Sequence, residues 1–380
     1  MAGKGLFTFN IRAFKWLANV HINEKMGIFS KSFVLVSLLI TVLHEVSLVM
    51  DLVLNGFVDF ERLCEDFPMV MAFFMVSYEY YNIIAQKENI EELLTDLEET
   101  ISTWRPQFAM HSYRKTIMGK AVDLLDKLGL YNIIFGEFCV FMWVVRPLVV
   151  RSGKLPFGNP WFPFDTQRYY YYLWFMHTYV GVLGGGNTIN VHVFYGKVMA
   201  VIAEEFDIIS HSFKCIHTGL EMCMEDEMLE RAKQCIRYHQ RLLKSCANLQ
   251  KCINGIMVCQ FCFGISLCFA ALATFSMSAF NGAFINLVNH IVLELSELYF
   301  FCWFSSKLTE HGQKISLGIY HSCWYTRGEK MKRMLRFTMM RCDKPIVIKA
   351  GNLLPISIGS YIWILQQSYS FFMVLRTVKT

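Results

Sequence analysis

Seven apolar segments restrict this chain to a membrane fold. Each is long enough to cross, as an α-helix, a hydrocarbon core about 30 Å thick. Since 54% of the 380 residues are hydrophobic and only 18% are charged, the composition favours several spans in one membrane domain over a water-soluble fold. The sequence therefore predicts an all-α, polytopic membrane protein with seven transmembrane helices. The segments cover residues 31–53, 67–86, 129–149, 169–203, 255–276, 282–304 and 353–375.

The lysines and arginines indicate how these helices are oriented. Of the 36 such residues, 28 fall in the N-terminal segment and in the connections at 87–128, 204–254 and 306–352. Seven fall on the other side, and Lys197 lies within the fourth segment. Connections rich in Lys and Arg stay in the cytosol. The pattern predicts a cytosolic N-terminus and an extracellular C-terminus, which is the reverse of a G-protein-coupled receptor.

The cytosolic connections are predicted to be partly helical. Apolar residues recur at helical spacing beside charged faces at 89–103 and 222–252. This pattern fits packing within one subunit, and it also fits a cytosolic anchor where subunits meet, formed by 204–254 and 306–349. In the second interpretation, the buried side of the anchor consists of Tyr320, Trp324, Tyr325 and Leu335.

Residues 1–30 mix charged with apolar residues and contain no long apolar core. We therefore expect no cleavable signal peptide. We expect instead a cytosolic amphipathic segment that lies on the membrane surface. Its apolar side chains are Leu6, Phe7, Phe9, Phe14, Trp16 and Leu17.

The last apolar segment carries its polar residues on one side. At about 100° per residue, Ser360, Gln367 and Ser370 share a face that Val374 and Thr377 extend. Polar groups at membrane depth are costly unless they are paired or hydrated. Such a stripe suits a helix that faces water or other copies of itself, and several copies around a symmetry axis enclose a channel. The sequence therefore predicts that this segment, 353–375, lines an ion pore.

Aromatic side chains crowd the predicted outer halves of the second, third and fourth spans. They recur at helical spacing beside a few hydroxyls and one Met, which suits an apolar pocket for a small volatile molecule. The same pattern also fits helix packing and an interfacial aromatic belt. The candidate ligand-binding residues are Phe73, Val76, Ser77, Tyr80, Phe138, Phe141, Met142, Tyr171, Trp174, Phe175 and Thr178.

No set of residues in the sequence indicates an enzyme, since no acid, base and nucleophile converge in a recognisable motif. His44 and Glu45 lie mid-span, where ionisable residues are functional candidates, yet they point about 100° apart. A structural polar contact and a proton relay both remain open, and we favour the contact. Glu294 and Glu297 lie one turn apart. This spacing suits a cation, but without His partners we favour hydrogen bonds between helices.

Thirteen cysteines do not indicate disulfides, because most of them fall in segments predicted to be cytosolic. Cys259 and Cys262 form a Cys-x-x-Cys inside an apolar run, with no second pair and no nearby His. Buried small hydrophobes explain them better than a metal or redox site. We expect no metal, no other cofactor and no nucleic acid partner, and we expect membrane lipids around the spans.

The C-terminal part of the chain contains a series of short motifs. They are Cys302-Trp303-Phe304-Ser305-Ser306-Lys307-Leu308-Thr309, Trp324-Tyr325, Met334-Leu335, Met339-Met340-Arg341, Lys344-Pro345, Ala350-Gly351 and Tyr369-Ser370-Phe371-Phe372. Together they resemble the C-terminal signature of insect odorant receptors. Phe162-Pro163-Phe164-Asp165 also resembles the turn that precedes the fourth span in that family. The likeness extends over the whole chain in its pattern of spans and loops, and it is most specific over 297–375.

The resemblance implies an odorant-binding subunit of a heterotetrameric, ligand-gated, non-selective cation channel in the plasma membrane of a sensory dendrite. The implied partners are the obligate co-receptor and a small volatile ligand held among the second to sixth spans. Val374 matches the hydrophobic ring that closes the pore, with Phe371 nearby. The co-receptor and the gustatory receptors carry Thr-Tyr followed, after five intervening residues, by Gln-Phe. Ser370-Phe371 and Thr377-Val378 depart from this pattern and imply a ligand-specific subunit.

Two alternatives remain at this stage. A gustatory-type receptor channel shares the architecture, but the missing Thr-Tyr and Gln-Phe pairs count against it. A secondary transporter would need an internal repeat and broken helices. The sequence contains no internal repeat, although four glycines could interrupt the fourth span: Gly181, Gly184, Gly185 and Gly186.

Overall fold

The computed structural model describes residues 6–22, 24–56, 60–106, 111–150, 153–158, 160–217, 225–277 and 282–379. Within these ranges the side chains at 56, 60–62, 64–65, 111–125, 150, 273–277, 282–287, 371–372 and 374–379 lie outside the description.

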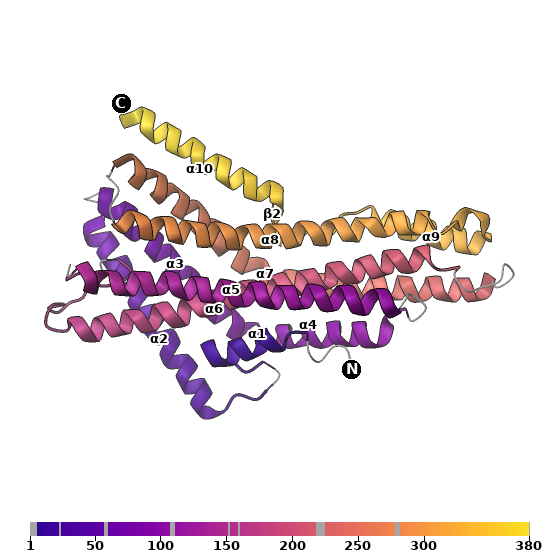
Figure 1. The fold of residues 1–380 in the computed structure, drawn as a ribbon, viewed down its shortest axis with the longest axis horizontal. Coiled ribbons are helices and arrows are strands. Elements are labelled where there is room, and N and C mark those ends of the chain that lie inside the picture. Colours follow the sequence, from indigo (N-terminus) through magenta and orange to yellow (C-terminus); the bar gives the residue numbers. More distant parts are fainter. Residues whose placement is uncertain are drawn as a thin grey trace.

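Helices make up nearly all of the described chain (Figure 1). Short π- or 3-10-helical turns, η1 to η4, flank some of them, and β1 pairs with β2 in an antiparallel hairpin. The elements are α1 Thr8–Ala13, η1 Phe14–Ala18, α2 Ile28–Asp51, η2 Leu52–Gly56, α3 Phe60–Ala85, α4 Lys87–Glu99, η3 Thr100–Trp104, α5 His111–Val150, α6 Tyr170–Lys214, α7 Glu225–Met277, α8 Gly282–Tyr320, η4 Trp324–Thr326, α9 Glu329–Cys342, β1 Lys349–Ala350, β2 Leu354–Pro355 and α10 Ile358–Lys379.

The seven predicted spans are confirmed as helices α2, α3, α5, α6, α7, α8 and α10. Three stretches of the described chain are apolar and long enough to cross a membrane when judged singly, namely Ile28–Asn55, Asp126–Val149 and Glu225–Leu272. The last helix starts five residues later than predicted, at Ile358. The β1–β2 hairpin occupies the intervening residues, and it turns at Gly351 and Asn352, whose φ angles are 59° and 58°.

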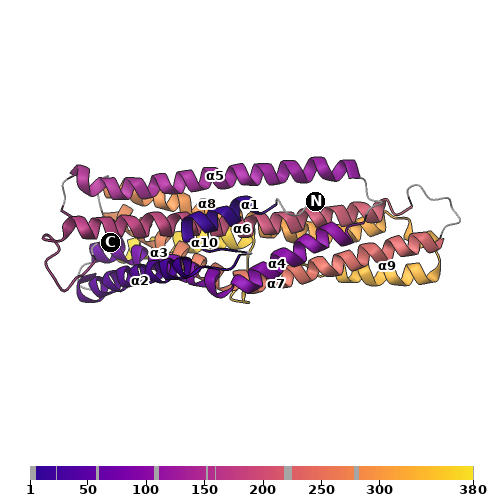
Figure 2. The ribbon, with the colours of Figure 1, turned by 90° about the horizontal axis from the view of Figure 1, so that it is seen from below.

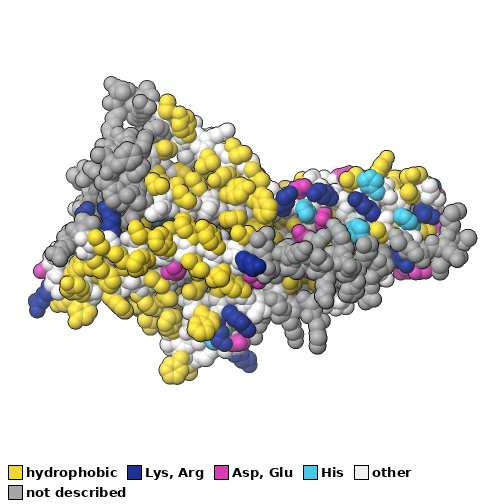
Figure 3. Space-filling view, viewed as in Figure 1, with side chains coloured by type: hydrophobic (Ala, Val, Ile, Leu, Met, Phe, Trp, Pro, Cys, Tyr) yellow, Lys and Arg dark blue, Asp and Glu magenta, His cyan; other side chains and the backbone are white. Residues whose placement is uncertain are grey.

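The helices divide the molecule into an apolar zone and a charged zone. The apolar zone contains α2, α3, α10 and the adjoining parts of α5 to α8, and the charged zone contains α4, α9 and the other ends of α5 to α8 (Figure 1). Hydrophobic side chains gather over the first zone, whereas Lys, Arg, Asp, Glu and His gather over the second (Figure 3). At roughly 1.5 Å per residue, the 53 residues of α7 measure about 80 Å. This helix therefore continues through both zones (Figure 2).

The N-terminal segment packs on the protein, which corrects one expectation from the sequence. Phe7 and Phe14 are buried against Phe194 of α6, with ring centroids 6.0 and 5.5 Å apart. Trp16, in contrast, is 85% exposed. The prediction that the whole apolar face lies on the membrane surface is therefore wrong for the two phenylalanines, because α6 offers them an apolar surface within the chain.

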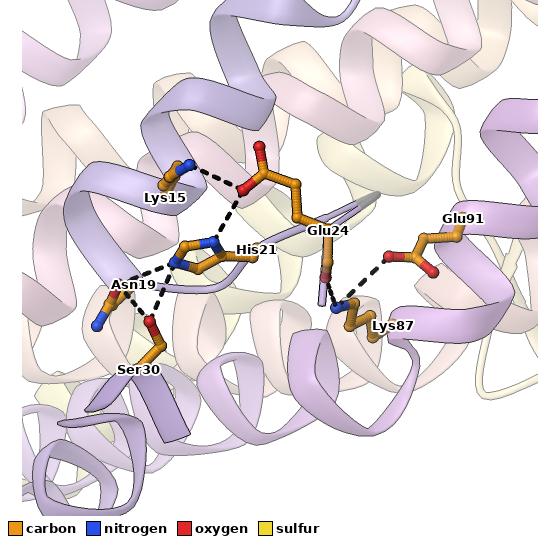
Figure 4. Close-up of polar contacts among 7 residues, drawn as sticks. All are labelled: Lys15, Asn19, His21, Glu24, Ser30, Lys87 and Glu91. Carbon is orange, nitrogen blue, oxygen red and sulfur yellow. Dashed lines mark hydrogen bonds and ion pairs between the residues drawn. The ribbon is translucent and has the colours of Figure 1, made fainter. Parts of the chain in front are cut away.

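Polar contacts hold the loop after η1 between α2 and α4 (Figure 4). Glu24 Oε2 accepts hydrogen bonds from Lys15 Nζ at 2.8 Å and from His21 Nδ1 at 3.0 Å. Lys87 Nζ at the start of α4 donates to the backbone carbonyl of Glu24 at 2.8 Å. Ser30 of α2 lies 3.2 Å from His21 Nε2. These contacts are partly exposed, so they fix the path of the loop more than they stabilise the fold.

A buried ion pair crosses the charged zone. Arg105 Nε donates to Glu205 Oε2 at 2.8 Å, and Tyr238 OH donates to the same oxygen at 2.6 Å. Arg105 is 5% exposed and Glu205 is fully buried. Nearby on α7, burial lowers the pKa of His239 to about 4, so its imidazole is neutral at pH 7. The charged zone therefore has a packed interior of its own.

Removing the Glu205 carboxylate should destabilise the charged zone. Glu205→Ala takes this partner from a buried guanidinium, which costs about 3–5 kcal/mol. The control is Glu310→Ala, at an exposed position of α8. Hydrogen bonds from Lys307 and Lys314 lower the pKa of the Glu310 carboxyl to about 2. Such surface ion pairs nevertheless contribute at most about 1 kcal/mol to stability. Thermal unfolding of the detergent-solubilised chain should give a clearly lower midpoint for Glu205→Ala, and equal midpoints would contradict the interpretation.

Candidate functional site

A cavity of about 110 Å³ lies among α3, α5, α6, α7 and α8 in the apolar zone. Most of its wall is apolar and includes Phe73 and Val76 of α3, Trp143 of α5 and Phe263 of α7. An apolar cavity of roughly 150 Å³ is large enough for benzene. This cavity is somewhat smaller and is therefore suited to a compact molecule of at most about one ring.

Close packing of α5 on α6 shapes the cavity. A side chain at Gly136 of α5 would clash with Ile189, and a Cβ at Gly181 of α6 would lie 2.5 Å from the ring of Phe157. The fourth span was expected to break at its glycines if the chain were a transporter. Instead α6 continues as one helix through Gly181 and 184–186, which removes the main sequence feature that supported a transporter.

Phe157 closes the cavity from the α5–α6 connection. Its φ of 57° and that of Gly158, 96°, turn the chain inward. The ring is 6% exposed, packs edge-on against Phe73 at 5.8 Å and stacks on Trp143 at 6.1 Å. The backbone N–H of Trp161 donates to Ser47 of α2 at 2.9 Å, which holds the connection in place.

A buried polar network forms one side of the cavity. Glu294 and Glu297 of α8 line it. Gln260 Nε2 of α7 donates to Glu294 Oε1 at 2.8 Å. His192 of α6 lies between two carboxylates, with Nδ1 2.6 Å from Glu297 Oε2 and Nε2 2.7 Å from Glu79 Oε1. The network therefore joins α3, α6, α7 and α8.

The predicted hydrogen bonds between helices at Glu294 and Glu297 are confirmed, but the expectation that no His accompanies them is wrong. His192 comes from the fourth span, 105 residues away from Glu297 in the chain. Glu79 was missed because it lies between two tyrosines in an otherwise apolar stretch. The only sequence signal for Glu79 was its position as a single carboxylate within the second predicted span.

The structure brings some of the predicted ligand-binding residues to the cavity and leaves others away from it. Phe73 and Val76 line it. Ser77 and Tyr80 are buried further along α3, where Tyr80 OH donates to the Ala18 carbonyl at 3.0 Å. The remaining residues are outside the cavity wall: Met142, Trp174 and Thr178 are partly buried between helices, and Phe138, Phe141, Tyr171 and Phe175 are exposed.

The rotation of α5 and α6 about their axes explains why these predicted residues do not reach the cavity. Gly136, Cys139, Val140 and Trp143 of α5 face the cavity, so the predicted aromatic stripe on that helix points outward. Trp174 Nε1 donates to the Val144 carbonyl at 3.2 Å and so holds α6 against α5. Ligand contact by the outward-facing residues would need a site other than this cavity.

His44 makes the structural polar contact predicted for it. Its Nε2 lies 3.3 Å from His177 Nδ1, and the two rings meet edge-on at 4.3 Å. The His177 nitrogen also lies 2.7 Å from the Pro156 carbonyl. The pair therefore joins α2 and α6 beneath the α5–α6 connection.

Helix α10 packs on α7 and α8 at one side and otherwise stands apart from the bundle (Figure 1). Ile364 and Ser368 form its buried side. The predicted pore residues Ser360 and Gln367 are partly buried on the flank, and Ser370 is exposed. The side chains of the other predicted pore residues lie outside the described ones: Phe371, Val374 and Thr377.

Comparison with known proteins identifies the family. A family model described as 7tm Odorant receptor matches residues 59–369. The chain belongs to the odorant receptor family. The receptor is 25% identical to Odorant receptor Or2 of Anopheles gambiae over 262 residues, which cover 66% of this chain and 68% of that protein. The receptor is therefore not an enzyme.

Solved structures share its fold. The insect olfactory receptor OR5 from Machilis hrabei has a TM-score of 0.86 at 14% identity, over 99% of this chain and 97% of that one. The structure of that receptor in complex with eugenol gives a TM-score of 0.84 at 13% identity, with the same coverage. The all-α architecture with seven transmembrane helices predicted from the sequence is confirmed.

Removing the Phe157 ring should destabilise the apolar zone. Phe157→Ala deletes a buried ring between Phe73 and Trp143, and such truncations cost about 3–5 kcal/mol. Phe164→Ala, in the same connection but 45% exposed, is the control and should cost less than about 1 kcal/mol. Thermal unfolding in detergent measures both variants. A Phe157→Ala midpoint equal to that of Phe164→Ala would mean that Phe157 does not close the cavity.

Proposed function

We propose that the receptor is the odorant-binding subunit of a heterotetrameric, ligand-gated, non-selective cation channel, opened by a small volatile molecule in the cavity between α3 and α8. The cavity is the observation that supports this most directly, since it lies inside the apolar zone and has room for about one ring. Family membership supports odorant binding, and a receptor of the same fold has been solved in complex with eugenol.

The pore helix in this proposal is α10. Among its residues up to 370, whose side chains are described, only one side is covered by its own chain, and the flank that carries Ser360, Gln367 and Ser370 borders the uncovered side. Four such helices around an axis would direct these flanks toward a common channel. A single chain cannot enclose a conduit with one helix, so the function requires partner subunits.

The partner in this proposal is the co-receptor, which would meet the charged zone in the cytosol. Tyr320 and Tyr325 are 61% and 59% exposed, and Phe337 and Met340 of α9 are 66% and 65% exposed. Exposed apolar side chains gathered in one region, here the end of α8, η4 and α9, mark interaction surfaces. Leu335 is fully buried within its own chain and Trp324 is partly buried, so they would support this surface from beneath.

Helix α8 would carry the signal from ligand to pore. It lines the cavity with Glu294 and Glu297, and it touches α10 further along, where Tyr299 meets Tyr361 edge-on at 5.6 Å. The Ile358 N–H at the start of α10 donates to Ser306 Oγ at 3.0 Å. A ligand opens the channel only if it binds the open arrangement of these helices more tightly than the closed one.

Filling the cavity should weaken the response to odorants. Val76→Phe adds a ring to its wall and should raise the half-maximal ligand concentration at least roughly fivefold, since overpacking costs about 1–3 kcal/mol. Phe74→Trp, at a position on α3 that is 46% exposed, is the control. Whole-cell recording from cells that express the receptor with the co-receptor gives both dose–response curves. Identical curves would place the ligand elsewhere.

Shortening Val374 should raise the leak current. If this side chain closes the pore, Val374→Ala widens the hydrophobic constriction, and basal current should increase in cells that also express the co-receptor. Ile362→Ala, whose side chain is 48% exposed on the same helix, is the control. A basal current unchanged at equal surface expression would reject Val374 as the gate.

A further inference from the structure

We propose that the cavity selects ligands with a hydrogen-bond-donating head group, amines above all, through Glu294 and Glu297. The inference rests on the proposed odorant-binding function and specifies the chemistry of its ligand. The expected ligand has a compact apolar body of about one ring and a protonated amine or, less favourably, a hydroxyl.

The polar groups on the cavity wall are mostly hydrogen-bond acceptors. Glu294, Glu297, His290 and Thr188 line it, and no Lys or Arg is among the described lining residues. Each glutamate has one oxygen engaged, by Gln260 or by His192. Since a carboxylate offers about four acceptor sites, both side chains keep acceptor capacity for a ligand.

The charges of the polar network also favour a ligand that donates hydrogen bonds. His192 supplies at most one positive charge to three carboxylates, those of Glu79, Glu294 and Glu297. A buried carboxyl group without a cation beside it holds a proton instead of a charge. A neutral amine that enters the cavity can take up that proton and pair, as an ammonium, with the carboxylate that is left, whereas a hydroxyl only donates a hydrogen bond to the same group.

Thr188 provides an independent sign of a ligand. Its Oγ1 is buried and has no hydrogen-bond partner among the described residues. The Thr188 side chain lines the cavity and is 5% exposed. Buried hydroxyls are normally hydrogen-bonded. An ammonium group has three N–H donors, which matches the acceptors of Glu294, Glu297 and Thr188.

Magnitudes indicate why the head group matters. Burial of one ring, about 150 Å², supports at best a Kd of about 1 mM. A hydrogen bond to a charged group raises the affinity roughly ten- to a hundredfold. The polar wall therefore decides whether a ligand of this size binds usefully. A ligand that only accepts hydrogen bonds cannot take up a proton and gains no ion pair.

The first test compares head groups on one skeleton. Benzylamine, benzyl alcohol, benzaldehyde and toluene are applied to cells that express the full-length receptor with the co-receptor, and the series is repeated on a branched five-carbon skeleton. Benzylamine should be the most potent, followed by benzyl alcohol. The amine should exceed the aldehyde at least roughly fivefold, because leaving a buried polar group unpaired weakens binding roughly five- to a hundredfold.

The second test removes the charge. Glu294→Gln retains a hydrogen-bonding partner for Gln260 and should lower amine potency at least roughly tenfold while changing toluene potency less than about threefold. Thr188→Val should reduce amine potency in the same direction by roughly fivefold. Glu310→Gln, the same substitution at an exposed position further along α8, is the control and should match the wild type. Surface expression is measured for each variant.

The outcomes separate the two proposals. If wild-type receptor responds to benzaldehyde as well as to benzylamine on both skeletons, the selectivity inference is overturned and odorant binding stands. The same holds if Glu294→Gln and Thr188→Val, present at the surface, leave the amine response unchanged. If no compound of either series opens a channel although receptor and co-receptor reach the surface, the proposed function fails and the inference fails with it.

Discussion

The imidazole of His192, between Glu79 and Glu297, is the contact on which the arrangement of the long helices depends. Both ring nitrogens lie within 2.7 Å of a carboxylate oxygen, and all three side chains are buried. Buried charged groups tolerate little displacement, because losing a partner costs several kcal/mol. The contact therefore fixes the rotation of α8 relative to α3 and α6. Since residues three apart share a helix face, Glu294 then faces the cavity.

The same rotation explains the shape of the cavity. With α8 held by its glutamates, α5 approaches α6 along Gly136, and the space left between them is closed by Phe157. A purely apolar lining would give a drier interior, and replacing a buried ionic group by apolar residues is often stabilising. This chain instead keeps two carboxylates at the cavity wall. Binding of a ligand that donates hydrogen bonds would explain why these carboxyl groups are kept at the cavity wall, whereas packing alone does not explain it.

Length and hydropathy were sufficient to locate the seven spans, because any segment that crosses a bilayer needs about 20 apolar residues. They were insufficient to find the cavity. Both faces of α5 are apolar, one toward lipid and one toward the protein, so periodicity could not tell Phe138 and Phe141, which face outward, from Cys139 and Val140, which face the cavity. Gly136 carries no hydrophobic signal at all. The pairing of His192 with Glu79 and Glu297 depends on contacts more than 100 residues apart, which no local pattern encodes.

The polar network also offers a way for binding to act on the pore helix. Gln260 Nε2 already donates to Glu294 Oε1, so a ligand that donates to the free acceptor sites of the same carboxylate draws negative charge away from the contact between α7 and α8 and weakens it. Helix α10 packs on these two helices at its buried side, through Ile364 and Ser368. A change in how α7 meets α8 therefore alters the surface on which α10 rests. A head group that weakens one interhelical hydrogen bond adds to any preference of the apolar body for one arrangement, and only a difference in affinity between the two arrangements shifts a conformational equilibrium.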